Sequence, residues 1–275
     1  MVFVGKNLGF SLWLSVLLCG PLWAMTDYLR KMKLDILAIG VHPDDVELGC
    51  SGTLINEIKR GKKAGILDLT QGELGTRGTI DTRYEEAANA AKIIGVTVRE
   101  NLKMRDGFFK SDEDNQLLLI SAIRRFKPDI VFANVLHDRH PDHGRAGNMI
   151  SQCCFLSGLS KISTKDKDGK EQERWRPSYV LHYIQDWYHE PDLLIDITDS
   201  FEQRMKSIEA YTTQFHSKSG NEGPQTYIST PDFLESVIAR ARMFGKRIGV
   251  KYAEGFISEK KIGIRDLDSL IQNET

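Results

Sequence analysis

Short apolar runs alternate with amphipathic stretches through the first half of the chain. Strands are predicted at residues 34–41 (LDILAIGV), 64–69, 96–102 and 129–136 (DIVFANVL), and the first and last runs are almost continuously apolar. Such runs are typical of strands that are buried on both faces of a parallel sheet. Helices are predicted between them at residues 49–60, 82–94 and 115–126. This order predicts a single α/β domain built on a doubly wound, mostly parallel, Rossmann-like sheet.

The second half of the chain continues this pattern after one interruption. Residues 161–176 (KISTKDKDGKEQERWR) are polar and charged, and we interpret them as an exposed insertion because strand-like runs resume near residues 179 and 193. Helices are predicted near residues 200–215 and 231–249. The apolar positions of the last helix recur at helical spacing, which indicates a side that faces the core rather than a ligand.

The first thirty residues are interpreted separately from the fold. Residues 7–26 carry no charge and are mostly apolar, which allows a signal peptide, a spanning helix or a start placed too early. We favour the third interpretation, because Met32 is a natural opening for a protein whose first strand follows at once. Residues 1–31 are thus expected to lie outside a domain of residues 32–275. We expect a cytoplasmic protein without stable membrane insertion, export being the alternative.

Composition and charge exclude several classes of protein. Charged residues make up 27% and hydrophobic residues 41% of the chain, as in ordinary globular proteins. The formal net charge of −1 does not favour a nucleic acid as a partner. None of the four cysteines forms a CxxC pair, so we expect no disulfide framework, which fits a reducing compartment.

Two segments with the same three-letter core follow predicted strands. His42-Pro43-Asp44-Asp45 follows the first strand, and residues 140–143 (HPDH) follow the strand that ends near residue 136. Because the carboxyl ends of parallel strands meet at one edge, where ligands bind, these two turns are expected to meet in space. Catalytic zinc usually takes three such protein ligands and keeps one position open for water.

Each of these residues also has an ordinary structural explanation. Asp44 and Asp45 could cap the following helix, Pro43 could belong to a turn, and the histidines could lie in a surface loop. Taken singly, these explanations are at least as good as a functional one. Taken together they weaken, because three of the seven histidines lie within residues 137–143, opposite a second His/Asp cluster.

Several stretches resemble the LmbE/PIG-L family of zinc-dependent deacetylases. They are residues 32–53 (MKLDILAIGVHPDDVELGCSGT), 71–79 (QGELGTRGT), 106–109 (DGFF), 140–148 (HPDHGRAGN) and 241–256 (ARMFGKRIGVKYAEGF). The resemblance runs from Met32 to about residue 264 and is closest to the bacillithiol-biosynthesis branch. It implies an LmbE-type fold and removal of acetate from an N-acetylglucosaminyl conjugate, most of all N-acetylglucosaminyl malate. It also implies a bound Zn²⁺, with Fe²⁺ as the alternative, and a homo-oligomer.

The resemblance further implies a role for individual residues. By motif position, the residues that match the zinc ligands are His42, Asp45 and His143. Asp44 matches the general base, His140 matches the histidine that stabilises the oxyanion or protonates the leaving amine, and Asp142 matches its orienting partner. Arg77, in the Gly-rich loop, and Arg139 are the candidate substrate contacts, since arginine can hold a carboxylate with two hydrogen bonds. The alternative for each is a solvated loop residue, and this alternative is stronger for Arg139 than for Arg77.

Other functions remain as alternatives. Within the same chemistry, the substrate could be chitobiose, a glycolipid head group or an antibiotic precursor. A nucleotide-binding module would require a glycine-rich phosphate loop after the first strand, but that position holds HPDDVELGCSG, whose acids would repel a phosphate. A serine hydrolase of the α/β type would carry a GxSxG motif, which the sequence lacks.

Overall fold

The computed structural model describes residues 33–215 and 223–268. The expected leader, residues 1–31, lies outside the described residues. The described residues belong to one compact unit. None of the helices in these residues has the length and apolar character needed to span a membrane.

Seven strands form one sheet in the order β3-β2-β1-β4-β5-β7-β6. Their bounds are β1 (Ile36–Gly40), β2 (Ala64–Thr70), β3 (Val98–Met104), β4 (Ile130–Asn134), β5 (Tyr179–Tyr183), β6 (Leu193–Asp196) and β7 (Ala253–Ser258). The first five strands pair in parallel, whereas β7 is antiparallel to both β5 and β6. Every residue of β1 is buried, as its continuous apolar run predicts. The predicted mostly parallel sheet is confirmed.

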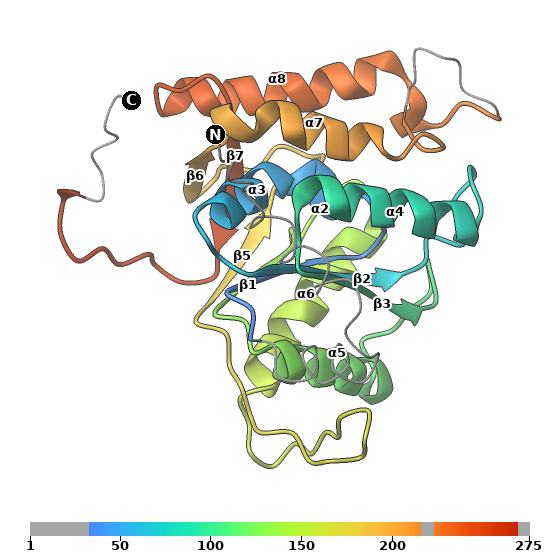
Figure 1. The fold of residues 1–275 in the computed structure, drawn as a ribbon, viewed down its shortest axis with the longest axis vertical. Helices are drawn as coiled ribbons and strands as arrows, with labels where there is room; N and C mark the ends of the chain where they lie inside the picture. Colours follow the sequence, from blue (N-terminus) through green and yellow to red (C-terminus); the bar gives the residue numbers. More distant parts are fainter. Residues whose placement is uncertain (1–32, 216–222, 269–275) are drawn as a thin grey trace, which may run out of the picture. The chain divides into compact units, whose positions relative to one another are not determined.

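Helices cover both faces of this sheet (Figure 1). Helices α5 and α6 lie together on one face, and the remaining α-helices lie on the other. The α-helices are α2 (Asp45–Gly49), α3 (Ser51–Lys59), α4 (Ile80–Ile94), α5 (Glu113–Phe126), α6 (Pro141–Leu156), α7 (Phe201–Glu209) and α8 (Pro231–Arg247). The arrangement confirms the doubly wound α/β class.

The structure differs from the prediction at three places. The helix expected at residues 49–60 is α3, but the short helix α2, which precedes it and is separated from it at Cys50, where φ is −152°, was not predicted. Residues 140–143 are not a simple turn, because Pro141 begins the sixteen-residue helix α6, as proline commonly does at the first helical position. Strand β7 was not predicted, since its sequence AEGFIS contains a glutamate and a glycine that weaken the strand pattern.

Two glycines bring the motif-bearing helices close to the sheet. A Cβ added at Gly49 of α2 would lie 2.2 Å from the ring of Tyr183 in β5. A Cβ added at Gly147 of α6 would lie 2.5 Å from the carbonyl oxygen of Asn134, at the end of β4. Only glycine permits approaches of this kind without a shift of the backbone. Both helices therefore begin directly at the carboxyl edge of the sheet.

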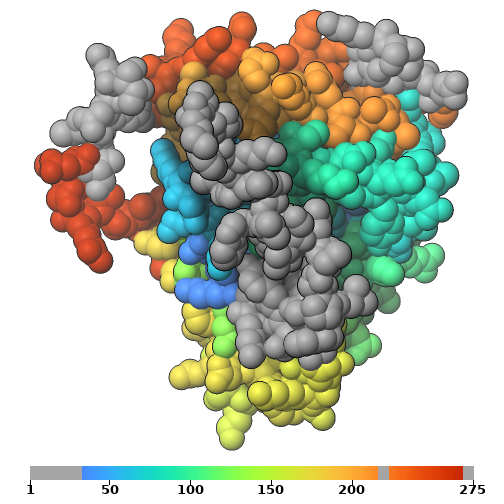
Figure 2. All heavy atoms as spheres, viewed as in Figure 1, coloured from blue at the N-terminus to red at the C-terminus, as the bar shows by residue number. Residues whose placement is uncertain are grey.

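The polar insertion is ordered and lies far from that edge. Residues Lys165 and Glu171 form an antiparallel bridge, and the Arg124 side chain of α5 donates to the carbonyl oxygens of Ser157, Leu159 and Ile162. The segment, yellow in Figures 1 and 2, packs beside α5. Its Trp175 indole donates to the carbonyl oxygen of Pro128, which precedes β4. It therefore packs near the amino end of β4, at the opposite end of this strand from the predicted site.

Candidate metal centre

The structure brings the two HPD segments together at the carboxyl ends of β1 and β4. The ring centroids of His42 and His143 are 5.7 Å apart, and the His140 ring lies 4.8 Å from the first and 5.2 Å from the second. Ligand atoms of the three imidazoles lie within 4.8 Å of one another. The segments are far apart in the sequence, but the parallel pairing of β1 with β4 places the residues that follow these two strands side by side.

Asp45 lies at the centre of this cluster with its carboxylate turned back toward the sheet. Its Oδ2 accepts from the backbone N–H groups of Val41 and His42, at 2.9 and 3.0 Å, and from the Asn134 side chain at 3.1 Å. Its Oδ1 accepts from the Gln185 amide at 2.7 Å. These donors hold a carboxylate that is 1% exposed, and none of them belongs to the first turn of α2. Asp45 is therefore not a helix cap.

The two imidazoles beside Asp45 are oriented by further carboxylates. His143 Nδ1 lies 2.7 Å from Asp138 Oδ2, which leaves Nε2 facing Asp45 Oδ1 at 3.2 Å. His42 Nε2 lies 3.0 Å from Asp106 Oδ1, which leaves Nδ1 facing Asp45 Oδ2 at 3.8 Å. Histidines that bind a metal usually donate their other ring N–H to such a carboxylate. One nitrogen of each ring is thus directed at the same carboxylate.

Asp44 differs from its neighbour in both backbone and partners. Its φ is 131°, a conformation that residues other than glycine rarely adopt, and its side chain makes no capping hydrogen bond. Arg83 of α4 donates to the Pro43 carbonyl oxygen at 2.5 Å and to Asp44 Oδ2 at 3.3 Å. Burial raises the pKa of Asp44 to about 7, although the Arg83 charge opposes this shift. The strained turn thus presents a second buried carboxylate beside the first.

The electrostatics of the cluster favour a positive charge between Asp45 and the imidazoles. Burial alone would lower the pKa of His143, but the carboxylates of Asp45 and Asp138 outweigh it and raise this pKa to about 9. By contrast, burial and the neighbouring imidazoles lower the pKa of His140 to about 4. The negative potential that holds a proton on His143 would equally attract a divalent cation.

A cavity of about 220 Å³ opens onto these residues. Its walls include His42, Asp44, Asp45, His140 and His143, together with Arg83, Asp106, Arg139 and Gln185. The lining also includes the apolar side chains of Leu48, Leu74 and Ile228. A cavity with apolar walls and convergent ionisable groups is the usual form of a catalytic site.

Comparison with known proteins identifies the family. A family model described as PIG-L: GlcNAc-PI de-N-acetylase matches residues 37–154. The uncharacterized deacetylase YaiS of Escherichia coli is 36% identical over 126 residues, which are 44% of this chain and 67% of the relative. The chain belongs to the PIG-L family.

Other relatives extend the match over most of the fold. The diacetylchitobiose deacetylase of Thermococcus kodakarensis is 25% identical over 230 residues, which cover 80% of this chain and 81% of that protein. The crystal structure of the conserved protein TT1542 from Thermus thermophilus is 35% identical and has a TM-score of 0.74. That similarity covers 84% of this chain and 97% of the crystallised one. This member of the PIG-L family is an enzyme.

The Asp142 carboxylate, which was predicted to orient His140, contacts other groups in the structure. The Asp142 carboxylate accepts from Gly107 N and from Arg145, at 2.8 and 2.9 Å, and its Oδ2 lies 3.8 Å from His42 Nε2. His140 instead accepts at Nδ1 from the backbone N–H of Asp142, at 3.3 Å, because it caps α6. The carboxylate of Asp142 thus supports the His42 side of the cluster.

The two predicted substrate arginines have different positions. Arg139 lines the cavity, where its Nε donates to Asp186 Oδ2 at 2.7 Å and its guanidinium stacks on Tyr227. Arg77 is 7% exposed and is not among the cavity-lining residues, because its loop turns the side chain into the protein. The arginine of this region that does line the cavity is Arg83, from the following helix.

Sequence reasoning missed the residues that hold the imidazoles. Asp106 was visible only as part of the family-like DGFF stretch, and Asp138 lies two residues before His140, outside the family-like segments. Gln185 and Asn134, which hold Asp45, carry no motif at all. A signal did exist for Asp138, since a carboxylate near a ligand histidine is the common orienting partner.

The donor set fits a divalent cation of the zinc type. Two imidazole nitrogens and one carboxylate are the ligands that catalytic zinc takes, and each imidazole already has its orienting carboxylate. Asp45 Oδ1 accepts one amide hydrogen bond and keeps a further lone pair for a metal. His140 is the one other imidazole of the described cluster within reach of such an ion.

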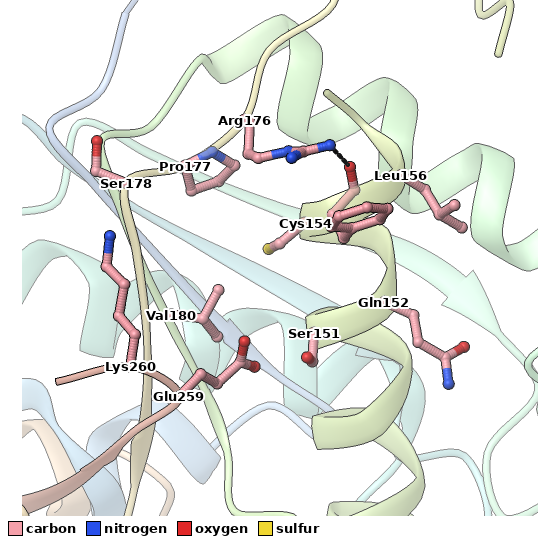
Figure 3. Close-up of a pocket in the computed structure, with 11 residues that line it drawn as sticks. Ser151, Gln152, Cys154, Leu156, Arg176, Pro177, Ser178, Val180, Glu259 and Lys260 are labelled. Atoms are coloured by element: carbon pink, nitrogen blue, oxygen red, sulfur yellow. Dashed lines mark hydrogen bonds between the residues drawn. The ribbon is translucent and has the colours of Figure 1, made fainter. Parts of the chain in front are cut away.

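A larger cavity, of about 700 Å³, lies elsewhere in the fold (Figure 3). Its walls come from the second half of α6, the segment that leads into β5 and the residues after β7, and they include Ser151, Cys154, Val180 and Glu259. Arg176 donates across it to the Phe155 carbonyl oxygen at 2.9 Å. No cluster of possible metal ligands was found here among residues 33–215 and 223–268.

Proposed function

We propose that this protein removes the acetyl group from an N-acetylglucosaminyl conjugate with the help of a bound divalent cation. Zinc is our first choice of metal and iron(II) the alternative. The observation that carries the proposal is the pair of imidazole nitrogens, His42 Nδ1 and His143 Nε2, that face the two oxygens of Asp45. We assign these three residues as the metal ligands.

The residues around the ligands supply the rest of a hydrolytic site. When bound, the cation supplies a Lewis acid that lowers the pKa of water and polarises a carbonyl group. Asp44 has no place in the proposed ligand set and lines the same cavity, so its carboxylate can accept the proton of the attacking water. Water oxygen bonds to the acetamide carbon, the C–N bond breaks, and the products are acetate and the sugar amine. The burial of Asp44 beside Arg83 fixes the position of this base.

His140 is suited to donate a hydrogen bond during this reaction. Its Nδ1 accepts from the Asp142 backbone, so the neutral ring carries its proton on Nε2. That N–H can stabilise the oxyanion that forms on the acetyl oxygen, and the proton that Asp44 takes from the water can pass to the departing nitrogen. The catalytic set that we propose is therefore Asp44 and His140, with Asp142 acting as a support for the His42 side.

Two aglycones have support of different kinds. The sequence resemblance puts N-acetylglucosaminyl malate first, with Arg77 and Arg139 as the carboxylate contacts. Diacetylchitobiose has the support of a relative that is 25% identical and is named as its deacetylase. The arginines that line the cavity give little support to malate as the aglycone, because Arg83 and Arg139 each already contact an aspartate. Our proposal therefore fixes the sugar and the bond, and treats malate, a second sugar and a glycolipid head group as competing aglycones.

The setting of the reaction belongs to the same proposal. We place it in the cytoplasm, on the sequence argument about cysteines and the start of the first strand. Among the described cysteines, Cys50, Cys153 and Cys154 are free and buried, which is compatible with that setting. A homo-oligomer is expected by analogy with the family.

Acetate release tests the proposed function. The protein is loaded with Zn²⁺ or Fe²⁺ and supplied with N-acetylglucosaminyl malate, diacetylchitobiose and free N-acetylglucosamine, and acetate is measured enzymatically. We expect turnover of at least one conjugate, and its loss on chelation and recovery on return of the metal. The Asp44→Asn variant is the control for contaminating activity. Absence of acetate from every metal-loaded sample would contradict the proposal.

A further inference from the structure

Exposed apolar side chains lie on the loops that line the small cavity. Leu74, Phe108 and Tyr227 are 59%, 62% and 54% exposed, and we call these three residues the apolar collar. Leu74 lines the cavity, Phe108 follows the lining residue Gly107, and Tyr227 precedes the lining residue Ile228. Exposed apolar groups that cluster at one place usually mark a binding surface.

The loops that carry one side of the collar are fixed to each other. Leu74 follows β2, and its backbone N–H donates to Asp106 Oδ2 at 3.0 Å. The backbone N–H of Asp106, in the loop after β3, donates to Glu73 Oε1 at 2.8 Å. Gly107, with φ of 70°, lets the Leu74 side chain pack against it, since an added Cβ would lie 3.2 Å from Leu74 Cδ1. These hydrogen bonds fix the backbone of the two loops that carry the exposed side chains of Leu74 and Phe108.

The opposite side of the collar is fixed in a similar way. The Tyr227 hydroxyl donates to Asp186 Oδ1 at 3.1 Å, and the Arg139 guanidinium lies 4.1 Å from the centre of the Tyr227 ring. Arg139 also donates to the same Asp186 carboxylate. The aromatic ring therefore stands at the cavity mouth with its hydroxyl engaged and much of its surface in solvent.

The charges that line the cavity do not favour an anionic aglycone, and the one further cation that contacts the described collar on this side, Arg105, lies 5.0 Å from the centre of the Phe108 ring. Among the described lining residues, the permanently cationic ones are Arg83 and Arg139. The first contacts the Asp44 carboxylate and the second the Asp186 carboxylate. A dianion such as malate would have to compete with these aspartates for both guanidinium groups. An uncharged aglycone meets no such competition.

We infer that the apolar collar selects N-acetylglucosaminyl conjugates whose aglycone is uncharged and carries an alkyl or aryl surface. This inference rests on the proposed deacetylation and adds the class of aglycone. The sugar occupies the polar cavity beside His42 and His143, and the aglycone covers Leu74 and Phe108 on one side or Tyr227 on the other. Because the collar is already exposed in the free protein, covering it removes apolar surface from water on both partners.

The size of the expected effect follows from the area covered. Each methylene that is fully buried favours binding about fourfold. A hexyl chain that buries two of its methylenes against the collar would therefore be preferred over a methyl group by more than about tenfold. The preference should fall mainly in KM, because the aglycone contacts are made equally in the bound substrate and in the transition state.

The test is a series of glycosides that share N-acetylglucosamine and differ in the aglycone. Acetate release is measured for the methyl, hexyl, phenyl and malyl glycosides, with the metal-loaded protein. We expect kcat/KM for the hexyl and phenyl compounds to exceed that for the methyl compound at least tenfold, and the malyl compound to gain nothing. Leu74→Ser and Phe108→Ser should each lower the hexyl-to-methyl ratio at least threefold.

The matched control is Phe155→Ser. Phe155 is 57% exposed, but it lines the larger cavity, so its variant should keep the native hexyl-to-methyl ratio. Because the ratio compares two substrates on one preparation, a loss of folded protein does not alter it. A ratio near one in the native protein, or a preference for the malyl compound, would overturn the collar inference alone. Failure of every glycoside, the methyl compound included, would overturn the proposed deacetylation instead.

Discussion

The two cavities of this protein differ in almost every property that matters for catalysis. The larger one, about 700 Å³, is lined by α6 and the residues around β5 and β7. Most of its lining surface is apolar, and its polar side chains do not form a cluster of possible metal ligands. The smaller one, about 220 Å³, lies at the carboxyl edge of the parallel strands. There, Asp44, Asp45 and three imidazoles converge within a few ångströms.

The comparison shows that convergence of charge, and not volume, marks the site. Glu259, in the larger cavity, lies with Oε1 3.0 Å from Nε2 of His182. This pair gives the buried His182 ring a local hydrogen-bond partner. At the smaller cavity, carboxylates are linked to one another through imidazoles, as Asp138 and Asp45 are through His143. Such chains are expensive to bury and persist where they orient reacting groups.

If only the smaller cavity is catalytic, the largest loss of activity is expected on replacement of Asp44. Asp44→Asn removes the proposed base but keeps the shape of the side chain. It should lower kcat for acetate release by about 10²–10⁴-fold. Metal content, measured by atomic absorption after dialysis, should stay at the native level because Asp44 is outside the proposed ligand set. Full activity in this variant would remove Asp44 from the mechanism.

Asp45 and His140 are the two candidates for the third metal ligand, beside His42 and His143, and replacing each of them in turn distinguishes between them. Asp45→Asn should weaken metal binding more than about 100-fold, since loss of a direct ligand exceeds the cost of losing an orienting partner. His140→Gln should bind the metal about as well as the native protein and lose activity. Competition with a chelating dye gives both affinities. The reverse order of affinities would assign His140 to the metal.

A smaller effect is expected at the carboxylate that orients His143. Asp138→Asn keeps the volume of a side chain that contacts His143 Nδ1 but removes its charge. Metal affinity or activity should fall about 10- to 100-fold, as for other orienting partners of ligand histidines. Circular dichroism checks that the fold survives. An unchanged affinity would show that His143 needs no such support.

The smallest effect is expected in the larger cavity. Gln152 is exposed on its wall, and Gln152→Ala should leave kcat/KM for acetate release within about twofold of native. The same preparation should bind one equivalent of metal. A loss comparable to that of the Asp44 variant would mean that the larger cavity takes part in the reaction, and the contrast between the cavities would fail.

Local patterns predicted most of the fold. The buried run of β1 and the helix that ends at Gly95 were predictable, because burial and a left-handed C-terminal glycine both leave marks in sequence. Helix α6 was missed because Pro141 was assigned to a turn, although proline also starts helices. Strand β7 was missed because Glu254, which binds the start of α3, occupies a position that a strand pattern gives to an apolar residue.

The site was predictable only as far as its motifs extend. His42 and His143 follow strands that must share an edge, so their approach could be expected from the order of elements. The groups that orient them could not, because Asp106 reaches His42 from the loop after another strand. The side chain of Arg77 could not be placed either, since the direction of a loop residue depends on packing that no local pattern records.

We propose that two segments a hundred residues apart in the sequence share one metal ion. The most direct test is the metal-to-chain ratio after exhaustive dialysis of the native protein and of His42→Ala and His143→Ala. We expect one divalent cation per chain in the native protein and almost none in either variant. Retention of a full equivalent by one of the two variants would contradict it.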